Sequence, residues 1–360
     1  MTRAATLVFP VSTPEGRAYL DAALARREPV VAASCDPCDP IAGKAPWRRL
    51  PLVHESGFLP ALRALIQEHT VGQMFAGAHM VHAAVSDTVR MHGLDLRIVN
   101  ASTIETAYAR WDDIFARAET WRSIILAIEG RAPDLPFLAG AIRLAFDLFG
   151  ESYDDKLAAM LACLLSAPGG DIVEIGTLFG RSASVLLAGR ALGSAARRVI
   201  VFDPWSAEIG AQSDLPDALK AYTARTDFDT IARAFEATFA AIAPQGAFAA
   251  FRAASAEGRA WYAGAHDLEH VRLKSFDAIA PAGAVALLHI DGNHDSGPAM
   301  QDVDLWSPLV APGGWCVIDD YCWRYGEGPR RAGDALLARW GDKVARAFVV
   351  GGCLFVQRGP

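Results

Sequence analysis

The segment "LLHIDGNHDSG", residues 287–297, joins an apolar run to two histidines, two aspartates, an asparagine and two glycines. Imidazole, carboxylate and amide groups can accept protons, hold metal ions or hydrogen-bond hydroxyl groups. Placed directly after a buried strand, they indicate a site, because α/β enzymes bind ligands at the carboxyl edge of a parallel sheet. The same residue types also suit a plain turn in which Asp and Asn cap the following helix.

A second polar turn lies in "DIVEIGTLFGRSASVLL", residues 171–187, where an apolar strand leads through Gly176 and Gly180 into a helix. Glycines let the backbone turn sharply and approach a ligand closely, and a helix N-terminus favours negative charge. The spacing is E-x-G-x-x-x-G and not the G-x-G-x-x-G of dinucleotide sites. The carboxylate of Glu174 would repel a diphosphate, but it suits the ammonium group of an amino acid. A cofactor that is both nucleoside and amino acid is S-adenosylmethionine.

Two further residues fit the same cofactor. Asp203 ends the next apolar run, "RRVIVFDPW", where an acid can accept hydrogen bonds from ribose hydroxyls. Ser255 opens a helix in "FRAASAEG", where adenine contacts are expected. Each signal alone also fits ordinary packing, but acid, glycine turn and ribose acid in this order predict a methyltransferase. The predicted cofactor contacts are Glu174, Gly176, Thr177, Gly180, Ser182, Asp203, Ser255 and Asp291.

The elements that must position these residues form an α/β pattern. Apolar runs separated by helical segments predict parallel strands with crossovers. Gly351 and Gly352 alone join the last two runs, which suits a tight antiparallel hairpin. We therefore predict a doubly wound, seven-stranded sheet whose final strand is antiparallel. Its strands are expected near residues 171–175, 198–203, 246–252, 285–291, 314–319, 345–350 and 353–357.

The N-terminal part predicts a smaller α/β domain, followed from about residue 103 by helices. Pro133 and Pro136 mark the expected boundary, giving an auxiliary domain at 1–132 and a catalytic domain at 133–360. No phosphate-binding glycine loop of the usual spacing is visible in the first domain, which favours a structural role. Its strands are expected at residues 5–11, 28–34, 49–54 and 71–77, with helices at 14–27 and 57–69.

Net charge and hydropathy limit the classes of binding partner. The 360-residue chain has a formal charge of −7 and a pI near 5.7, which argues against nucleic acid or membrane surfaces as partners. No run approaches the roughly 20 apolar residues of a membrane span, and we expect a cytoplasmic protein with a small-molecule substrate. The long segment after Asp203 predicts a lid, a substrate wall or the contact of a homo-oligomer. Cys35 and Cys38 form one C-x-x-C, interpreted as loop thiols rather than a zinc site.

The half from about residue 150 onward resembles class I S-adenosylmethionine-dependent O-methyltransferases of the macrocin and mycinamicin type, together with a similar cephalosporin-biosynthesis enzyme. The resemblance rests on "VEIGTLFGRSA", "VFDPW", "HIDGNHD", "DVDLWSPLVAPGGWCVIDDY" and "GPRRAGDAL". It implies a Rossmann-like class I methyltransferase fold, and the first 130 residues have no part in it. In such enzymes the matching acids bind a divalent metal, usually magnesium, and the matching histidine is the general base. Carried over, the metal ligands are Asp291, Asp319 and Asp320, and the base is His294.

The implied chemistry is consistent with physical expectation. Asp291 and the pair Asp319 and Asp320 follow neighbouring strands, and three crowded carboxylates repel one another unless a cation such as Mg²⁺ neutralises them. A metal-bound hydroxyl of a sugar-like or polyhydroxylated natural product would lose its proton to His294 and attack the sulfonium methyl group. His289 is expected to pack inward or face the cofactor, and Asp295 to be solvated.

Two other functions fit the same residues. The acids could hold the substrate of an N- or S-methyltransferase without any metal. Alternatively, the cofactor-binding half could be catalytically silent and serve as a scaffold. The sequence leaves the acceptor's identity and the need for a metal open.

Overall fold

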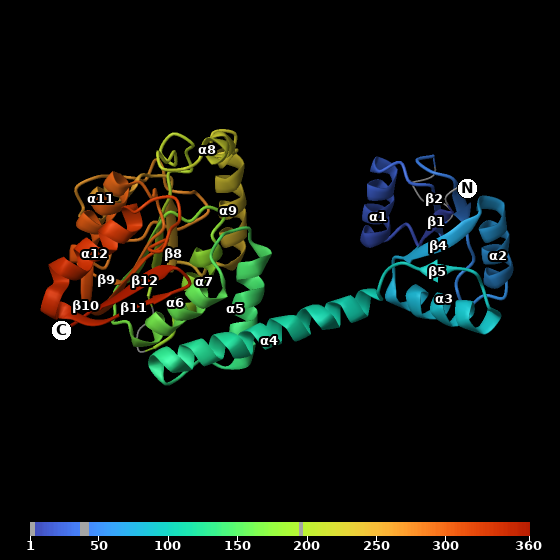
Figure 1. Ribbon diagram of the computed structural model, residues 1–360, viewed down its shortest axis with the longest axis horizontal. Helices are drawn as coiled ribbons and strands as arrows, with labels where there is room; N and C mark the ends of the chain where they lie inside the picture. The colour runs from blue at the N-terminus through green and yellow to red at the C-terminus, as the bar shows by residue number, and fades with distance from the viewer. Residues whose placement is uncertain (1–3, 37–42, 194–196) are drawn as a thin grey trace. The chain divides into compact units, whose positions relative to one another are not determined.

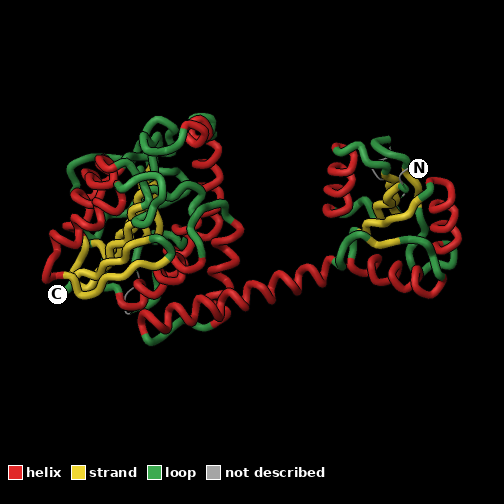
Figure 2. Tube along the Cα trace, viewed as in Figure 1, coloured by secondary structure: helices red, strands yellow, loops and turns green. Residues whose placement is uncertain are grey.

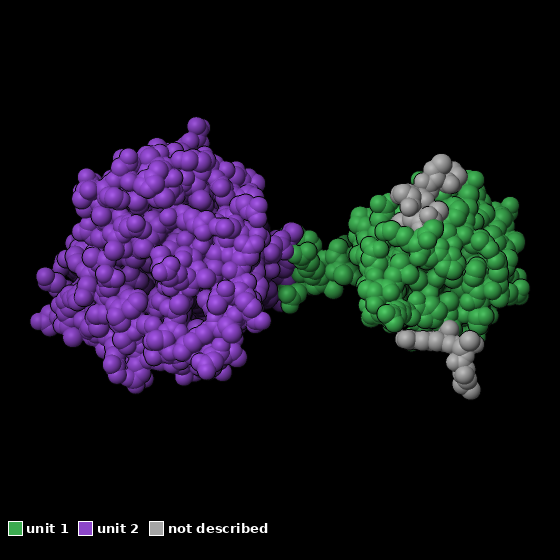
Figure 3. All heavy atoms as spheres, turned by 90° about the horizontal axis from the view of Figure 1, so that it is seen from above, with its two compact units in different colours: residues 1–113 green, residues 114–360 purple. Residues whose placement is uncertain are grey.

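A computed structural model describes residues 4–36, 43–193 and 197–360 of the chain (Figure 1). Cys38, and with it the predicted C-x-x-C pair, lies outside these residues. The chain divides into two compact units, residues 1–113 and 114–360, which Figure 3 colours separately. No helix in the described ranges combines the length and apolarity that a membrane crossing needs.

The first unit is a five-stranded parallel sheet in the order β3-β2-β1-β4-β5, with α1, α2 and α3 packed against it (Figure 2). The small α/β domain predicted from the sequence is therefore confirmed. The strand expected at 49–54 ends at Arg49, and β5 was not predicted, because it has only two residues. The elements are β1 (Ala5–Phe9), α1 (Pro14–Ala25), β2 (Val30–Ser34), β3 (Trp47–Arg49), α2 (Phe58–His69), β4 (Val71–Ala76), α3 (His79–His92) and β5 (Arg97–Ile98).

The second unit is built on a seven-stranded sheet in the order β11-β12-β10-β9-β6-β7-β8. β12 runs antiparallel to both of its neighbours, β10 and β11, and Gly351 and Gly352 turn the chain with φ of 59° and 82°. The predicted class I methyltransferase sheet is thus confirmed. The strands are β6 (Asp171–Ile175), β7 (Val199–Phe202), β8 (Phe248–Phe251), β9 (Val285–Ile290), β10 (Val310–Ile318), β11 (Val344–Val350) and β12 (Cys353–Arg358).

Helices cover both faces of this sheet (Figure 1). The helices are α4 (Thr103–Glu129), α5 (Leu135–Asp147), α6 (Asp154–Ser166), α7 (Arg181–Gly189), α8 (Asp217–Thr223), α9 (Phe228–Ile242), α10 (Ser255–Tyr262), α11 (Ser296–Trp306) and α12 (Gly328–Trp340), with short 3₁₀ turns at Ser307–Leu309 and Gly341–Lys343.

The division between the units falls inside α4, before the boundary expected from the prolines. The second half of α4 buries Ile114, Ala118, Trp121 and Ile125 in the larger core of the second unit. Proline spacing marks where a helix ends, and it does not show which core the helix packs into. The contacts therefore assign residues 114–132 to the second unit.

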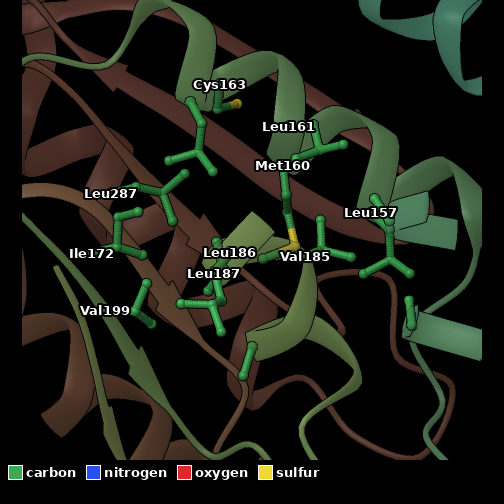
Figure 4. Packing of buried hydrophobic residues seen from close by; sticks show 14 of the residues in the cluster. Leu157, Met160, Leu161, Cys163, Ile172, Val185, Leu186, Leu187, Val199 and Leu287 are labelled. Atoms are coloured by element: carbon green, nitrogen blue, oxygen red, sulfur yellow. The ribbon is translucent and has the colours of Figure 1, made fainter. Parts of the chain in front are cut away.

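Helix α6 is buried along most of its length. Every residue from Lys156 to Leu165 is buried, and Figure 4 shows its apolar side chains packed against those of α7 and the sheet. A helix that is apolar all round belongs in a core. Lys156 is the one charged residue in that buried run, so its ammonium group requires partners.

The strand registers bring several strand ends to one edge of the sheet. Ile175 of β6 pairs with both Phe202 of β7 and Ile290 of β9, and Ile290 pairs in turn with Ile318 of β10. The residues that follow these four strand ends are therefore neighbours. The strand order also reverses between β6 and β9, which is where doubly wound sheets bind ligands.

Candidate active site

The glycine turn after β6 is tightly packed at both glycines. Gly176 has φ +79°, and a Cβ there would overlap the carbonyl oxygen of Asp291 after β9. Gly180 has φ +90° at the start of α7, and a Cβ there would overlap the ring of Phe239 from α9. Both positions demand glycine, and the two turns after β6 and β9 touch each other.

Asp203 holds this turn in place. Its Oδ2 accepts hydrogen bonds from the backbone N–H groups of Thr177 at 2.8 Å and Leu178 at 3.0 Å, and Oδ1 accepts one from Trp205 at 2.7 Å. Burial raises the pKa of Asp203, although the three N–H donors oppose that rise. Each carboxylate oxygen has a second lone pair, so the expected ribose contact stays a prediction beside this observed one.

Glu174 and His289 form a buried pair across β6 and β9. They lie opposite each other in register, both side chains are fully buried, and His289 Nδ1 lies 2.8 Å from Glu174 Oε1. His289 thus packs inward, as its place on the strand indicated. Glu174 Oε2 and His289 Nε2 have no hydrogen-bond partner within the described ranges. The unpartnered Glu174 oxygen is the atom that the predicted ammonium contact would use.

The two predicted serines lie in the first turns of their helices. Ser182 is buried in α7, and Ser255 begins α10. The Ser255 hydroxyl accepts a hydrogen bond of 2.9 Å from the indole of Trp306 and also contacts Asp302. It therefore anchors α11 to α10, and its contact with adenine stays a prediction.

Asp302 makes stability depend on pH. Burial raises its pKa to about 6 despite the hydrogen bond from Ser255, and only 5% of the residue is exposed. Between about pH 4 and pH 6 the folded state keeps a proton that the unfolded chain releases, so this residue lowers stability as pH rises through that window. Asp302→Asn should raise the free energy of unfolding at pH 7 by about 2 to 3 kcal/mol.

Urea denaturation at intervals from pH 4 to pH 8 measures this difference. The gap between Asp302→Asn and wild type should open as pH rises and then level off above pH 6. The exposed Asp342→Asn is the matched control and should follow the wild type. A constant gap between the Asp302 variant and wild type would show that the side chain does not titrate as described.

The acids at the strand ends surround a lysine. Asp291 follows β9, Asp319 follows β10, and Lys156 reaches them from α6. Lys156 Nζ donates to Asp291 Oδ2 at 3.0 Å and also to Asp319 Oδ2. Burial opposes the lysine charge, but Asp291 and Asp319 outweigh burial and raise the pKa of Lys156. Asp319 Oδ1 accepts from the backbone N–H of Asp320 at 2.9 Å and from the Cys353 thiol at 2.6 Å.

Asp320 faces His294 and does not join this pair. Asp320 has φ +51°, and its Oδ2 lies 3.5 Å from His294 Nδ1, while His294 Nε2 lies 3.9 Å from Asp291 Oδ1. Burial and the neighbouring Asp319 raise the pKa of Asp320 to about 6. Burial opposes a charge on His294, but Asp291 and Asp320 outweigh it and raise the pKa of His294. Neither ring nitrogen of His294 has a hydrogen-bond partner in the described part of the chain.

The fit of a metal ion can be tested on these residues. Among the described residues, His289, Asp291 and Asp319 offer ligand atoms within 4.8 Å of one another, whereas Asp320 is not in that group. The ammonium of Lys156 already binds an oxygen of each aspartate and supplies positive charge there. A dication does not fit between these oxygens while Lys156 occupies the space.

Two residues of the 287–297 segment have a role that the sequence did not indicate. Asn293 donates to the carbonyl oxygens of Ile209 and Ala211, at 3.0 and 2.7 Å. Asp295 is partly exposed to solvent, and it also accepts from the backbone N–H groups of Ser213 at 2.7 Å and Asp214 at 3.3 Å. The turn after β9 therefore fastens the loop between β7 and α8. Helix α9, from the same long segment, packs into the core through Phe235 and Phe239. The lid, substrate wall or oligomer contact expected of this segment stays a prediction.

Comparisons with known proteins identify the domain. Residues 173–321 match the family model described as a methyltransferase domain. Solved structures that align include the O-methyltransferase NovP (17% identity, 57% of this chain, 80% of that one, TM-score 0.39) and the calicheamicin methyltransferase CalS11 (14%, 73%, 95%, 0.39). The mycinamycin-pathway methyltransferase MycE, solved with Mg and SAH, also aligns (14%, 64%, 55%, 0.36). No curated protein sequence matches the chain.

The family match covers the glycine turn after β6, the segment after β9 and the acids after β10. The chain therefore contains a methyltransferase domain, and that domain lies in the second unit. The protein is an S-adenosylmethionine-dependent methyltransferase.

Proposed function

We propose that the enzyme transfers the methyl group of S-adenosylmethionine to a hydroxyl oxygen of a small, sugar-like or polyhydroxylated molecule. The observation that supports this most is His294, a half-buried imidazole that lies beside Asp291 and Asp320 and whose ring nitrogens make no hydrogen bond to the described residues. It lies beside Asp291, whose backbone touches the glycine turn at Gly176. A proton acceptor and the expected cofactor turn thus share one edge of the sheet.

The proposed reaction needs one proton transfer and one displacement. His294 accepts the proton of the acceptor hydroxyl, and the oxygen attacks the methyl carbon of the sulfonium. The new O–C bond forms as the C–S bond breaks, which leaves S-adenosylhomocysteine. Asp320, 3.5 Å from Nδ1, stabilises the imidazolium that results. A hydroxyl needs such a base far more than a neutral amine does, which favours oxygen as the nucleophile.

The proposal is tested by incubating the protein with methyl-labelled S-adenosylmethionine and a panel of glycosides and polyols. Mass spectrometry then locates the label in the product. Label on a hydroxyl oxygen supports the proposal. Label only on nitrogen or sulfur would assign the enzyme to a different acceptor class, and calorimetric binding of the cofactor with no transfer to any hydroxylated compound would indicate a silent scaffold.

A further inference from the structure

We infer that Lys156 takes the place of a divalent metal ion: its ammonium group is the resident cation of the acid cluster formed by Asp291 and Asp319, and the enzyme works without a metal. The part of this inference that concerns methyl transfer rests on the proposed function. The part that concerns metal binding stands on the geometry alone.

The first argument is space. Mg²⁺ binds carboxylate oxygens at about 2.1 Å, so an ion shared by Asp291 Oδ2 and Asp319 Oδ2 would lie between them. Lys156 Nζ lies there already, bonded to both oxygens. The ion and the nitrogen would overlap, and their like charges would repel each other.

The second argument is that Lys156 cannot easily withdraw. Only 3% of its side chain is exposed, and the helix that carries it is packed on all sides. The hairpin turn at Gly351 packs closely against the backbone of Lys156. A Cβ atom on Gly351 would lie 2.9 Å from the backbone nitrogen of Lys156. Two residues earlier, Asp154 is fixed by Arg117 at 2.9 Å and by the indole of Trp121 at 2.7 Å. Releasing the lysine would require moving α6 or burying an ammonium without partners.

The third argument is charge. Two carboxylates that lie this close need a cation, and one ammonium leaves the pair with a net charge of about −1 where a dication would neutralise it. That remaining negative charge lies beside His294, whose Nε2 is 3.9 Å from Asp291 Oδ1. Lys156 therefore sets both the position of Asp291 and the charge that the imidazole experiences. We assign it as a positioning residue, because it contacts the acids and not the reacting atoms.

The test measures metal binding directly, with no acceptor and no methyl transfer. Electron paramagnetic resonance of added Mn²⁺ counts bound ions for the wild type, Lys156→Ala, Lys156→Gln and the control Lys343→Met, which changes an exposed lysine. Wild type and Lys343→Met should bind no stoichiometric Mn²⁺. Lys156→Ala frees the space and leaves two carboxylates without a cation. It should bind one Mn²⁺ ion per chain, at least about tenfold more tightly than the wild type does. Lys156→Gln, which also lacks the ammonium group, should change in the same direction. Mn²⁺ should raise the melting temperature of these two variants and not that of the wild type or Lys343→Met.

A parallel assay follows methyl transfer after dialysis against EDTA. The wild type should keep its full rate, whereas any rate that Lys156→Ala retains should require added metal. One tightly bound Mn²⁺ per wild-type chain, or no new Mn²⁺ site in Lys156→Ala, would overturn the inference. If Lys156→Ala does not fold, Lys156→Gln replaces it in both assays. The Mn²⁺ measurement on the wild type tests the inference without either variant. An enzyme that binds no Mn²⁺ and methylates no hydroxyl would contradict the proposed function and leave this inference standing.

Discussion

Gly176→Ala should abolish binding of S-adenosylmethionine and lower the free energy of unfolding by about 2 to 4 kcal/mol. A non-glycine residue at φ +79° costs about 1 kcal/mol, and overpacking a filled site costs about 1 to 3 kcal/mol more. The added methyl group would overlap the carbonyl oxygen of Asp291, and that oxygen belongs to backbone held by a 2.8 Å hydrogen bond from Asp291 N to Ile175. The turns after β6 and β9 would have to separate, and with them the expected cofactor site.

Gly264→Ala is the matched control for this variant. Gly264 has a similar φ of +71°, but a Cβ there would meet nothing within 4 Å. It should therefore lose about 1 kcal/mol of stability for the backbone conformation alone and bind the cofactor normally. Urea denaturation and calorimetric titration with S-adenosylmethionine measure both quantities. If both variants lost the same stability and bound the cofactor equally well, the close approach of the two turns would contribute to neither quantity.

The fold could be predicted from the sequence because each of its signals is local. Apolar runs between helices predicted the sheet, and the two glycines at 351 and 352 were too short a link for anything but a hairpin. Strand ends followed by polar residues then placed Asp291 and Asp319 at one edge, since parallel neighbours end together. The two-residue strand β5 escaped prediction, and the three-residue strand β3 was predicted with the wrong bounds, because such short strands show no periodicity.

The partners of the site's charged groups could not be predicted in the same way. Lys156 is 135 residues before Asp291, and no local pattern reports that α6 aims its one buried ammonium at the ends of β9 and β10. One signal was present, since a lysine at the head of a helix that is apolar on every face must find buried partners. The mechanism inferred from the resemblance required open space among three carboxylates, and Lys156 fills the space between two of them.

Asp319 and Asp320 show a second limit. The resemblance assigned both to one metal, but consecutive residues that follow a strand direct their side chains to different sides. In the structure Asp319 binds Lys156, and Asp320, with φ +51°, turns to His294. Asp320 therefore lies beside the predicted base, His294, because of how this turn folds. The turn gives Asp320 a place beside the proposed proton acceptor that the sequence did not suggest.

His294→Asn should lower kcat for methyl transfer by about 10²- to 10⁴-fold, the usual contribution of a general base. Binding of S-adenosylmethionine should change little, because the imidazole has no hydrogen-bond partner among the described residues whose loss would disturb the fold. In the wild type, kcat should rise with pH as His294 loses its proton. Because Asp291 and Asp320 outweigh burial and raise the pKa of His294, that rise should be centred above the usual histidine range.

Steady-state kinetics from pH 5 to pH 9, with calorimetry for the cofactor, separates this role from a structural one. The exposed His266→Asn is the matched control and should keep the wild-type rate and pH profile. Asp320→Asn should shift the rise in kcat to lower pH, because it removes a negative charge 3.5 Å from Nδ1 and so makes the imidazolium less stable. A profile that stays unchanged in Asp320→Asn, or a fully active His294→Asn, would show that another group accepts the proton.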